Sequence, residues 1–81
     1  MPRIPRDVSG RQLAQQLKRY GYVPTRQTAS HIRLTYRIQN REHHVTVPDH
    51  GYVKIGTLNG ILNDLAMFWG KPKEQIVKDL F

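Results

Sequence analysis

Three side chains that can do chemistry share one face of a predicted strand, the stretch TASHIRLTYRIQ at residues 28–39. Side chains two residues apart in a strand point the same way, so His31, Arg33 and Arg37 fall on one face and apolar side chains on the other. Histidine exchanges protons near neutral pH, and arginine can bind phosphate oxygens through two parallel hydrogen bonds. The pattern indicates proton transfer beside a phosphate-bearing ligand.

A helix is predicted before this strand, over about residues 9–20. Ser9 is suited to be its N-cap, and Gln12, three residues later, completes a capping box. Leucine and alanine recur at helical spacing, and Gly21 can take the left-handed conformation that ends a helix.

Three extended segments are predicted to form one antiparallel sheet. Pro24 has no N–H group for a strand ladder, so the first segment is expected at an edge. Val45 and Val47 are expected to face the core beside Leu34 and Ile38. The first segment begins with residues 22–24, and the other two are residues 28–39 and 43–47, with a turn at 40–42.

Two further helices are predicted after the sheet. Thr57 is the expected cap of a helix with an apolar face, Gly70 is expected to end it, and Pro72 starts a short third helix. The predicted fold class is therefore α+β, in the order α-β-β-β-α, with both main helices on one face of a three-stranded antiparallel sheet and a short C-terminal helix. A chain of 81 residues is expected to form one domain, residues 1–81.

The positive charge is concentrated in the first half of the chain. The sequence holds 13 Lys and Arg against 6 Asp and Glu, a net charge of +7. Residues 1–41 hold 9 basic residues and 1 acid (+8), whereas residues 42–81 hold 4 basic residues and 5 acids (−1). A field of one sign attracts polyanions, so nucleic acid is the leading partner, ahead of an anionic membrane or an acidic protein.

Composition argues against several other classes of protein. The sequence has no cysteine, so we expect neither a disulfide framework nor a thiolate metal site. It has no run of about 18 apolar residues and no apolar segment after the first basic residues, so neither a membrane span nor an export signal is expected. A cytoplasmic protein with no membrane partner is the default expectation.

Several motifs occur in an order that resembles the HicA-like toxins of bacterial and archaeal type II toxin–antitoxin systems. The resemblance covers most of the chain. In one departure, Ala29 stands where the family has the glycine of its Gly-Ser-His strand. The segments similar to the family's are SGRQLAQQLKRYGYV, ASHIRL, VTVPDH and IGTLNGIL.

This resemblance implies a fold like that of double-stranded-RNA-binding domains. It also implies the activity of an mRNA interferase, an endoribonuclease that is neutralised by a HicB-type antitoxin. From the residues themselves we expect no metal or other cofactor. By position, His31 matches the family's catalytic histidine and His50 the histidine after Val-Pro. RNA carries its own nucleophile, the 2′-hydroxyl, so histidine acid–base catalysis is the chemistry that His31 would supply.

The identity of a second proton-transfer group stays open between two residues. They are His50, in the loop after Pro48, and His44, on the neighbouring strand. The side chains expected to bind RNA phosphates are Arg33, Arg37, Arg26, Lys18 and Arg19.

Neighbouring residues on a strand are expected to face opposite ways. His43 and His44 therefore cannot both bind one metal ion, and no metal site is expected. By the same rule Ser30 is expected to point away from His31 and to be structural. A non-catalytic RNA-binding module is the alternative function, and a protein-interaction domain is a third.

Overall fold

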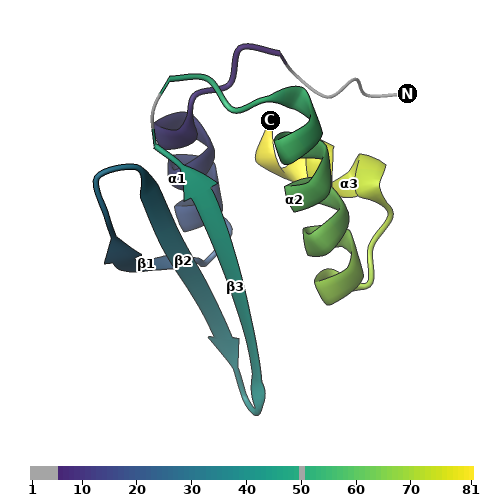
Figure 1. The fold of residues 1–81 in the computed structure, drawn as a ribbon. Helices are drawn as coiled ribbons and strands as arrows, with labels where there is room; N and C mark the ends of the chain where they lie inside the picture. Colours follow the sequence, from purple (N-terminus) through teal and green to yellow (C-terminus); the bar gives the residue numbers. More distant parts are fainter. Residues whose placement is uncertain (1–5, 50) are drawn as a thin grey trace.

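The computed structural model describes residues 6–49 and 51–81, arranged as a three-stranded antiparallel sheet covered on one face by helices (Figure 1). This is the predicted α+β order α-β-β-β-α, similar to a double-stranded-RNA-binding domain, with one more helix at the C-terminal end. The elements are α1 (Gly10–Arg19), β1 (Val23–Gln27), β2 (His31–Ile38), β3 (Arg41–Pro48), α2 (Ile55–Trp69) and α3 (Lys73–Leu80).

The sheet has β2 at its centre, between β1 and β3. Strands β2 and β3 pair along their whole length, from His31 opposite Pro48 to Ile38 opposite Arg41. The pairing of β1 with β2 shifts between Pro24 and Arg26, where β1 bulges. Pro24 lies on an edge strand, as its missing N–H group predicts.

The hydrophobic core lies between the sheet and the helices. Alternate residues of β2 and β3 supply the sheet side, and α1, α2 and α3 supply the other. The predicted packing of the third helix is confirmed, because its three apolar side chains are all buried. The buried core includes Leu34, Val45, Val47, Leu13, Leu17, Leu58, Leu62, Leu65, Ile76, Val77 and Leu80.

Helix α1 begins with the predicted capping box. The Ser9 hydroxyl accepts a hydrogen bond from the Gln12 amide at 3.1 Å, and the Ser9 amide donates to the Gln12 side chain at 2.9 Å. Two N–H groups that the first helical turn leaves without partners are thereby satisfied. The helix ends before Gly21, which has a φ of 108°.

Three strand predictions need correction. Strand β2 begins at His31, three residues later than predicted, because residues 28–30 form a turn. The hairpin turn is made by Gln39 and Asn40 rather than residues 40–42, since Gln39 takes a φ of 51° and β3 already begins at Arg41. Ile38 is 43% exposed, because it lies beside this turn, beyond the reach of the core.

The start of α2 also differs from the prediction. The helix begins at Ile55, its N-cap residue is Lys54, and Thr57 lies inside the first turn. The Val53 amide donates to the Val8 carbonyl at 2.7 Å, and this bond fixes the chain just before the helix. Gly70 ends the helix in the left-handed conformation, as predicted. In the part of the chain that the structure describes, no helix is long and apolar enough to cross a membrane.

A polar network joins α3 to the end of α1. Asp79 accepts hydrogen bonds from the side-chain Nε2 of Gln75 at 2.8 Å and the Tyr20 hydroxyl at 3.0 Å, and forms an ion pair with Lys71 at 3.3 Å. The bonds from Gln75, Tyr20 and Lys71 lower the pKa of the Asp79 carboxyl. This network and the apolar face of α3 hold the C-terminal helix against the rest of the fold.

Gly10, at the start of α1, lies directly against the end of β3. A β-carbon at this position would be 1.8 Å from the Pro48 carbonyl oxygen and 3.2 Å from the Asp49 α-carbon. Arg11, the next residue, forms an ion pair with Asp49 at 3.4 Å. The helix start and the segment after β3 are therefore in contact through backbone atoms.

Candidate functional site

The candidate site lies on the outer face of the sheet, which is the face turned away from the helices. In β2 the side chains of His31, Arg33, Thr35 and Arg37 alternate with the buried Ile32 and Leu34. His31, Arg33 and Arg37 are exposed, as the alternation predicts, whereas Thr35 is buried by its neighbours. On β2 the outer face therefore presents one histidine and two exposed arginines.

Ser30 contacts the imidazole of His31, which corrects the prediction that it points away. The Ser30 Oγ lies 3.0 Å from His31 Nδ1, within hydrogen-bond distance. The alternation rule fails here because Ser30 precedes the first residue of β2 and does not have strand geometry. This hydroxyl can fix which nitrogen of the imidazole carries the proton.

A turn before β2 holds Ser30 in this position. The His31 amide donates to the Thr28 Oγ1 at 3.1 Å, and the Thr28 amide donates to the His31 carbonyl at 2.9 Å. The Asp49 amide donates to the Ser30 carbonyl at 2.7 Å, which joins the turn to the end of β3. Thr28 and Asp49 are thus the residues that sequence reasoning missed, because their role depends on strand ends that no local pattern marks.

Arg26 and Arg33 are paired directly across β1 and β2. Like charges opposite one another on neighbouring strands destabilise a sheet. In the described ranges 6–49 and 51–81, neither guanidinium has a carboxylate within ion-pair distance. An anion bound between them would relieve the repulsion, so this pair is suited to a phosphate group.

Arg37 is in a different electrostatic setting. Its Nε donates to Glu42 at 3.1 Å, and the other carboxylate oxygen of Glu42 lies 2.7 Å from His44 Nε2. The other nitrogen of His44 lies 2.9 Å from the Thr35 hydroxyl. Arg37 therefore has a carboxylate partner, unlike Arg26 and Arg33.

The two candidates for a second proton-transfer group lie in different places. His44 is opposite Thr35, four residues along β2 from His31, a separation of about 13 Å at about 3.3 Å per residue. The structure does not bring His44 and His31 together. His50 lies outside the described residues and follows Asp49, whose amide binds Ser30.

Lys18 and Arg19 are remote from the outer face. They lie in the last turn of α1, which packs on the opposite, inner face of the sheet. Figure 1 shows α1 behind β2 and β3. The predicted set of phosphate-binding cations is thus divided between two sides of the protein.

A second histidine, His43, is part of a polar network on the inner face. Its Nε2 lies 3.0 Å from Asp64 and its Nδ1 lies 2.6 Å from the Tyr22 hydroxyl, which also accepts from the indole of Trp69 at 3.1 Å. A neutral imidazole with its proton on Nε2 satisfies every one of these bonds. The network joins β3 to α2, with Tyr22 only 2% exposed at its centre and the side chain of Asp64 59% exposed at its outer end.

Burial raises the pKa of Tyr22 to about 12. Between pH 10 and pH 12 the unfolded chain loses this proton while the folded chain keeps it, so the stability contributed by the neutral phenol is lost as the pH rises. We expect wild type to lose about 2 kcal/mol more unfolding free energy than Tyr22→Phe across this interval. Urea titrations of both proteins at several alkaline pH values measure the difference, and parallel curves would contradict it.

No cluster of three or more His, Asp or Glu side chains that could hold a metal occurs among residues 6–49 and 51–81. His43 and His44 face opposite sides of the sheet, with partners on different elements.

One comparison with known proteins gave a match. A family model described as "HicA toxin of bacterial toxin-antitoxin" matches residues 10–67, from the start of α1 nearly to the end of α2. Helix α3 lies beyond the matched region. Comparisons with curated proteins and with solved structures gave no match.

Proposed function

The chain belongs to the HicA toxin family of bacterial toxin–antitoxin systems, and from this premise we propose that it is an mRNA interferase, a toxin that cleaves RNA as a metal-independent endoribonuclease. The observation that carries the proposal is His31, exposed on a basic sheet face with Nδ1 in contact with Ser30. The reaction would take place in the cytoplasm, where mRNA is present.

In the proposed mechanism the RNA supplies its own nucleophile. His31 Nε2 takes the proton of a 2′-hydroxyl, while Nδ1 keeps its proton and donates it in a hydrogen bond to Ser30 Oγ. The 2′-oxygen attacks the adjacent phosphorus, and the bond to the 5′-oxygen breaks after that oxygen receives a proton. The products are a 2′,3′-cyclic phosphate and a free 5′-hydroxyl.

Arg33 and Arg26 are proposed to bind the phosphate oxygens. Arg33 lies two residues beyond His31 on β2, and Arg26 is paired opposite Arg33 on β1. Neither has a carboxylate partner among the described residues, so their charge is available to the negative transition state. Arg37 contributes less charge because Glu42 offsets it. Lys18 and Arg19 would contact only a long RNA that wraps around to the helices.

The leaving oxygen needs a proton donor. We assign this role to His50 in preference to His44, because His44 is about 13 Å along the sheet from His31 and cannot share one phosphodiester with it. His50 is adjacent in sequence to Asp49, whose amide binds Ser30.

The family also implies a cognate antitoxin. We propose that a HicB-type protein inhibits the toxin by covering the outer face. Acidic side chains on that partner would compete with RNA phosphates for Arg26 and Arg33, so inhibition and RNA binding would be mutually exclusive.

The proposal is tested by incubating the purified protein with end-labelled single-stranded RNA in EDTA. We expect fragments that end in a 2′,3′-cyclic phosphate, since the 2′-hydroxyl is the nucleophile. An RNA with 2′-deoxy sugars is the matched control and should stay intact. Binding of the RNA without cleavage would instead support a non-catalytic RNA-binding module. Cleavage that occurs without EDTA and stops when EDTA is added would contradict the proposed metal independence.

A further inference from the structure

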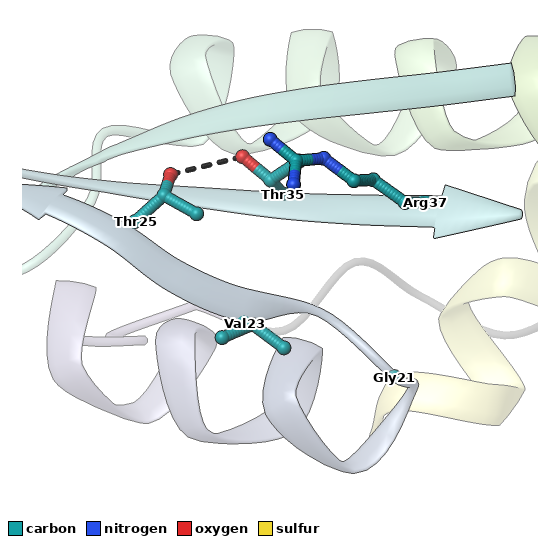
Figure 2. A pocket seen from close by; sticks show the side chains of 5 residues that line it. All are labelled: Gly21, Val23, Thr25, Thr35 and Arg37. Carbon is teal, nitrogen blue, oxygen red and sulfur yellow. Dashed lines mark hydrogen bonds between the residues drawn. The ribbon is translucent and has the colours of Figure 1, made fainter.

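A shallow pocket of about 280 Å³ lies on the outer face, where β1 meets β2. Figure 2 shows the Arg37 side chain running back along β2, so that its guanidinium lies beside Thr35 and opposite Thr25. Val23 forms part of the wall and is 59% exposed. Gly21, Val23, Thr25, Thr35 and Arg37 line the pocket.

Hydrogen bonds fix the polar wall of this pocket before any ligand enters. The hydroxyls of Thr25 and Thr35 are 2.9 Å apart, and Thr35 is also bonded to His44. Glu42 holds both His44 and Arg37. A wall that is already ordered loses little conformational entropy on binding.

The charges favour a planar, uncharged group over a phosphate. Glu42 offsets the charge of Arg37, whereas the neighbouring Arg26 and Arg33 have no such partner among the described residues. Phosphate is therefore attracted to the arginine pair. A guanidinium plane and an exposed aliphatic side chain suit the faces of a nucleobase, and the hydroxyl of the exposed Thr25 suits its edge.

The position of the pocket relates it to the cleavage site. Thr35 and His31 are on the same strand face, about 13 Å apart along β2, with Arg33 midway between them. Side chains two residues apart on this face have a spacing close to that of successive phosphates in an extended RNA strand. RNA following β2 would place one phosphate at His31 and the next at Arg33.

We propose that this pocket binds a nucleobase of single-stranded RNA about two nucleotides from the cleaved phosphate. The inference rests on the proposed function and adds a subsite to it. RNA would thus be held along β2 by His31, the arginine pair and the pocket in turn, and a substrate too short to reach the pocket would lose that part of the binding.

The test compares cleavage of a dinucleotide with cleavage of a single-stranded RNA of about eight nucleotides. Val23→Trp fills the pocket, and Thr25→Val removes a hydroxyl with little change of shape. We expect kcat/KM on the longer RNA to fall roughly tenfold in Val23→Trp and severalfold in Thr25→Val. The rate on the dinucleotide should stay unchanged in both, which also shows that the variants are folded.

Thr46→Val is the matched control, because Thr46 is an exposed threonine on the same face but outside the pocket. Equal losses on both RNAs, or a loss in Thr46→Val as large as that in Thr25→Val, would overturn the subsite. If wild type cuts neither RNA, the proposed function fails. Binding of the longer RNA then decides on the pocket: weaker binding by Val23→Trp supports it, and unchanged binding overturns it.

Discussion

Replacing His31 with alanine is expected to slow RNA cleavage by about 10²- to 10⁴-fold, the usual contribution of a general acid–base group. The side chain is exposed and lies outside the core, so the variant should fold and melt like wild type. RNA binding should be nearly unchanged, because the arginine pair proposed to bind phosphate is still present. Gel assays of cleavage and filter-binding assays of affinity separate the two effects.

Ser30→Ala gives the companion measurement. It removes the hydroxyl that contacts His31 Nδ1 and leaves the imidazole in place, so a smaller loss, roughly tenfold, is expected. Ser30→Thr keeps a hydroxyl and should restore part of the rate. Undiminished cleavage by His31→Ala would show that another residue performs the proton transfer, or that a contaminating nuclease is present.

Replacing Gly10 with alanine is expected to cause the largest loss of stability, about 3 kcal/mol. The added β-carbon would be 1.8 Å from the Pro48 oxygen and 2.9 Å from the Pro48 carbonyl carbon. Both are backbone atoms, so no flexible side chain can move aside. The start of α1 must shift away from β3, and a thermal melt should show a decrease in Tm of about 15 °C.

Gly60→Ala is the control for this substitution. Gly60 lies within α2, and a β-carbon there would meet nothing within 4 Å. Because alanine favours the helix over glycine by about 0.5–1 kcal/mol, this variant should be slightly more stable than wild type. A Gly10→Ala protein as stable as the Gly60→Ala protein would contradict the close contact between α1 and β3.

Elements with strong local signals could be predicted from the sequence. The capping box of Ser9 and Gln12 identifies the start of α1, and Gly70 identifies the end of α2. The alternation along β2 gives the correct buried face through Ile32 and Leu34. In each of these cases the physical cause acts over a few neighbouring residues, so the sequence pattern contains it.

Features set by contacts between distant residues could not be predicted. Helix α2 starts at Ile55, two residues before Thr57, and the segment leading into it is bonded through Val53 to Val8, far away in the sequence. The bulge in β1 places Arg26 opposite Arg33, and nothing local to either residue indicates that pairing. The tight contact at Gly10 likewise depends on where β3 ends.

The candidate site shows the same division. The shared face of His31, Arg33 and Arg37 follows from strand alternation, whereas the orientation of the imidazole does not. The contact of Ser30 with His31 arises because β2 starts one residue after Ser30. The ion pair that offsets Arg37 depends on the register between β2 and β3.

The opposed pair of Arg26 and Arg33 has a thermodynamic consequence for the whole molecule. Binding and folding are linked, so a polyanion that relieves the repulsion must stabilise the folded chain by the free energy that its binding supplies. Without a bound anion, the repulsion between these two arginines lowers the unfolding free energy of the free toxin. With the antitoxin placed on this pair as proposed above, its loss in a cell would leave a chain that is more easily unfolded and degraded, until another polyanion takes its place.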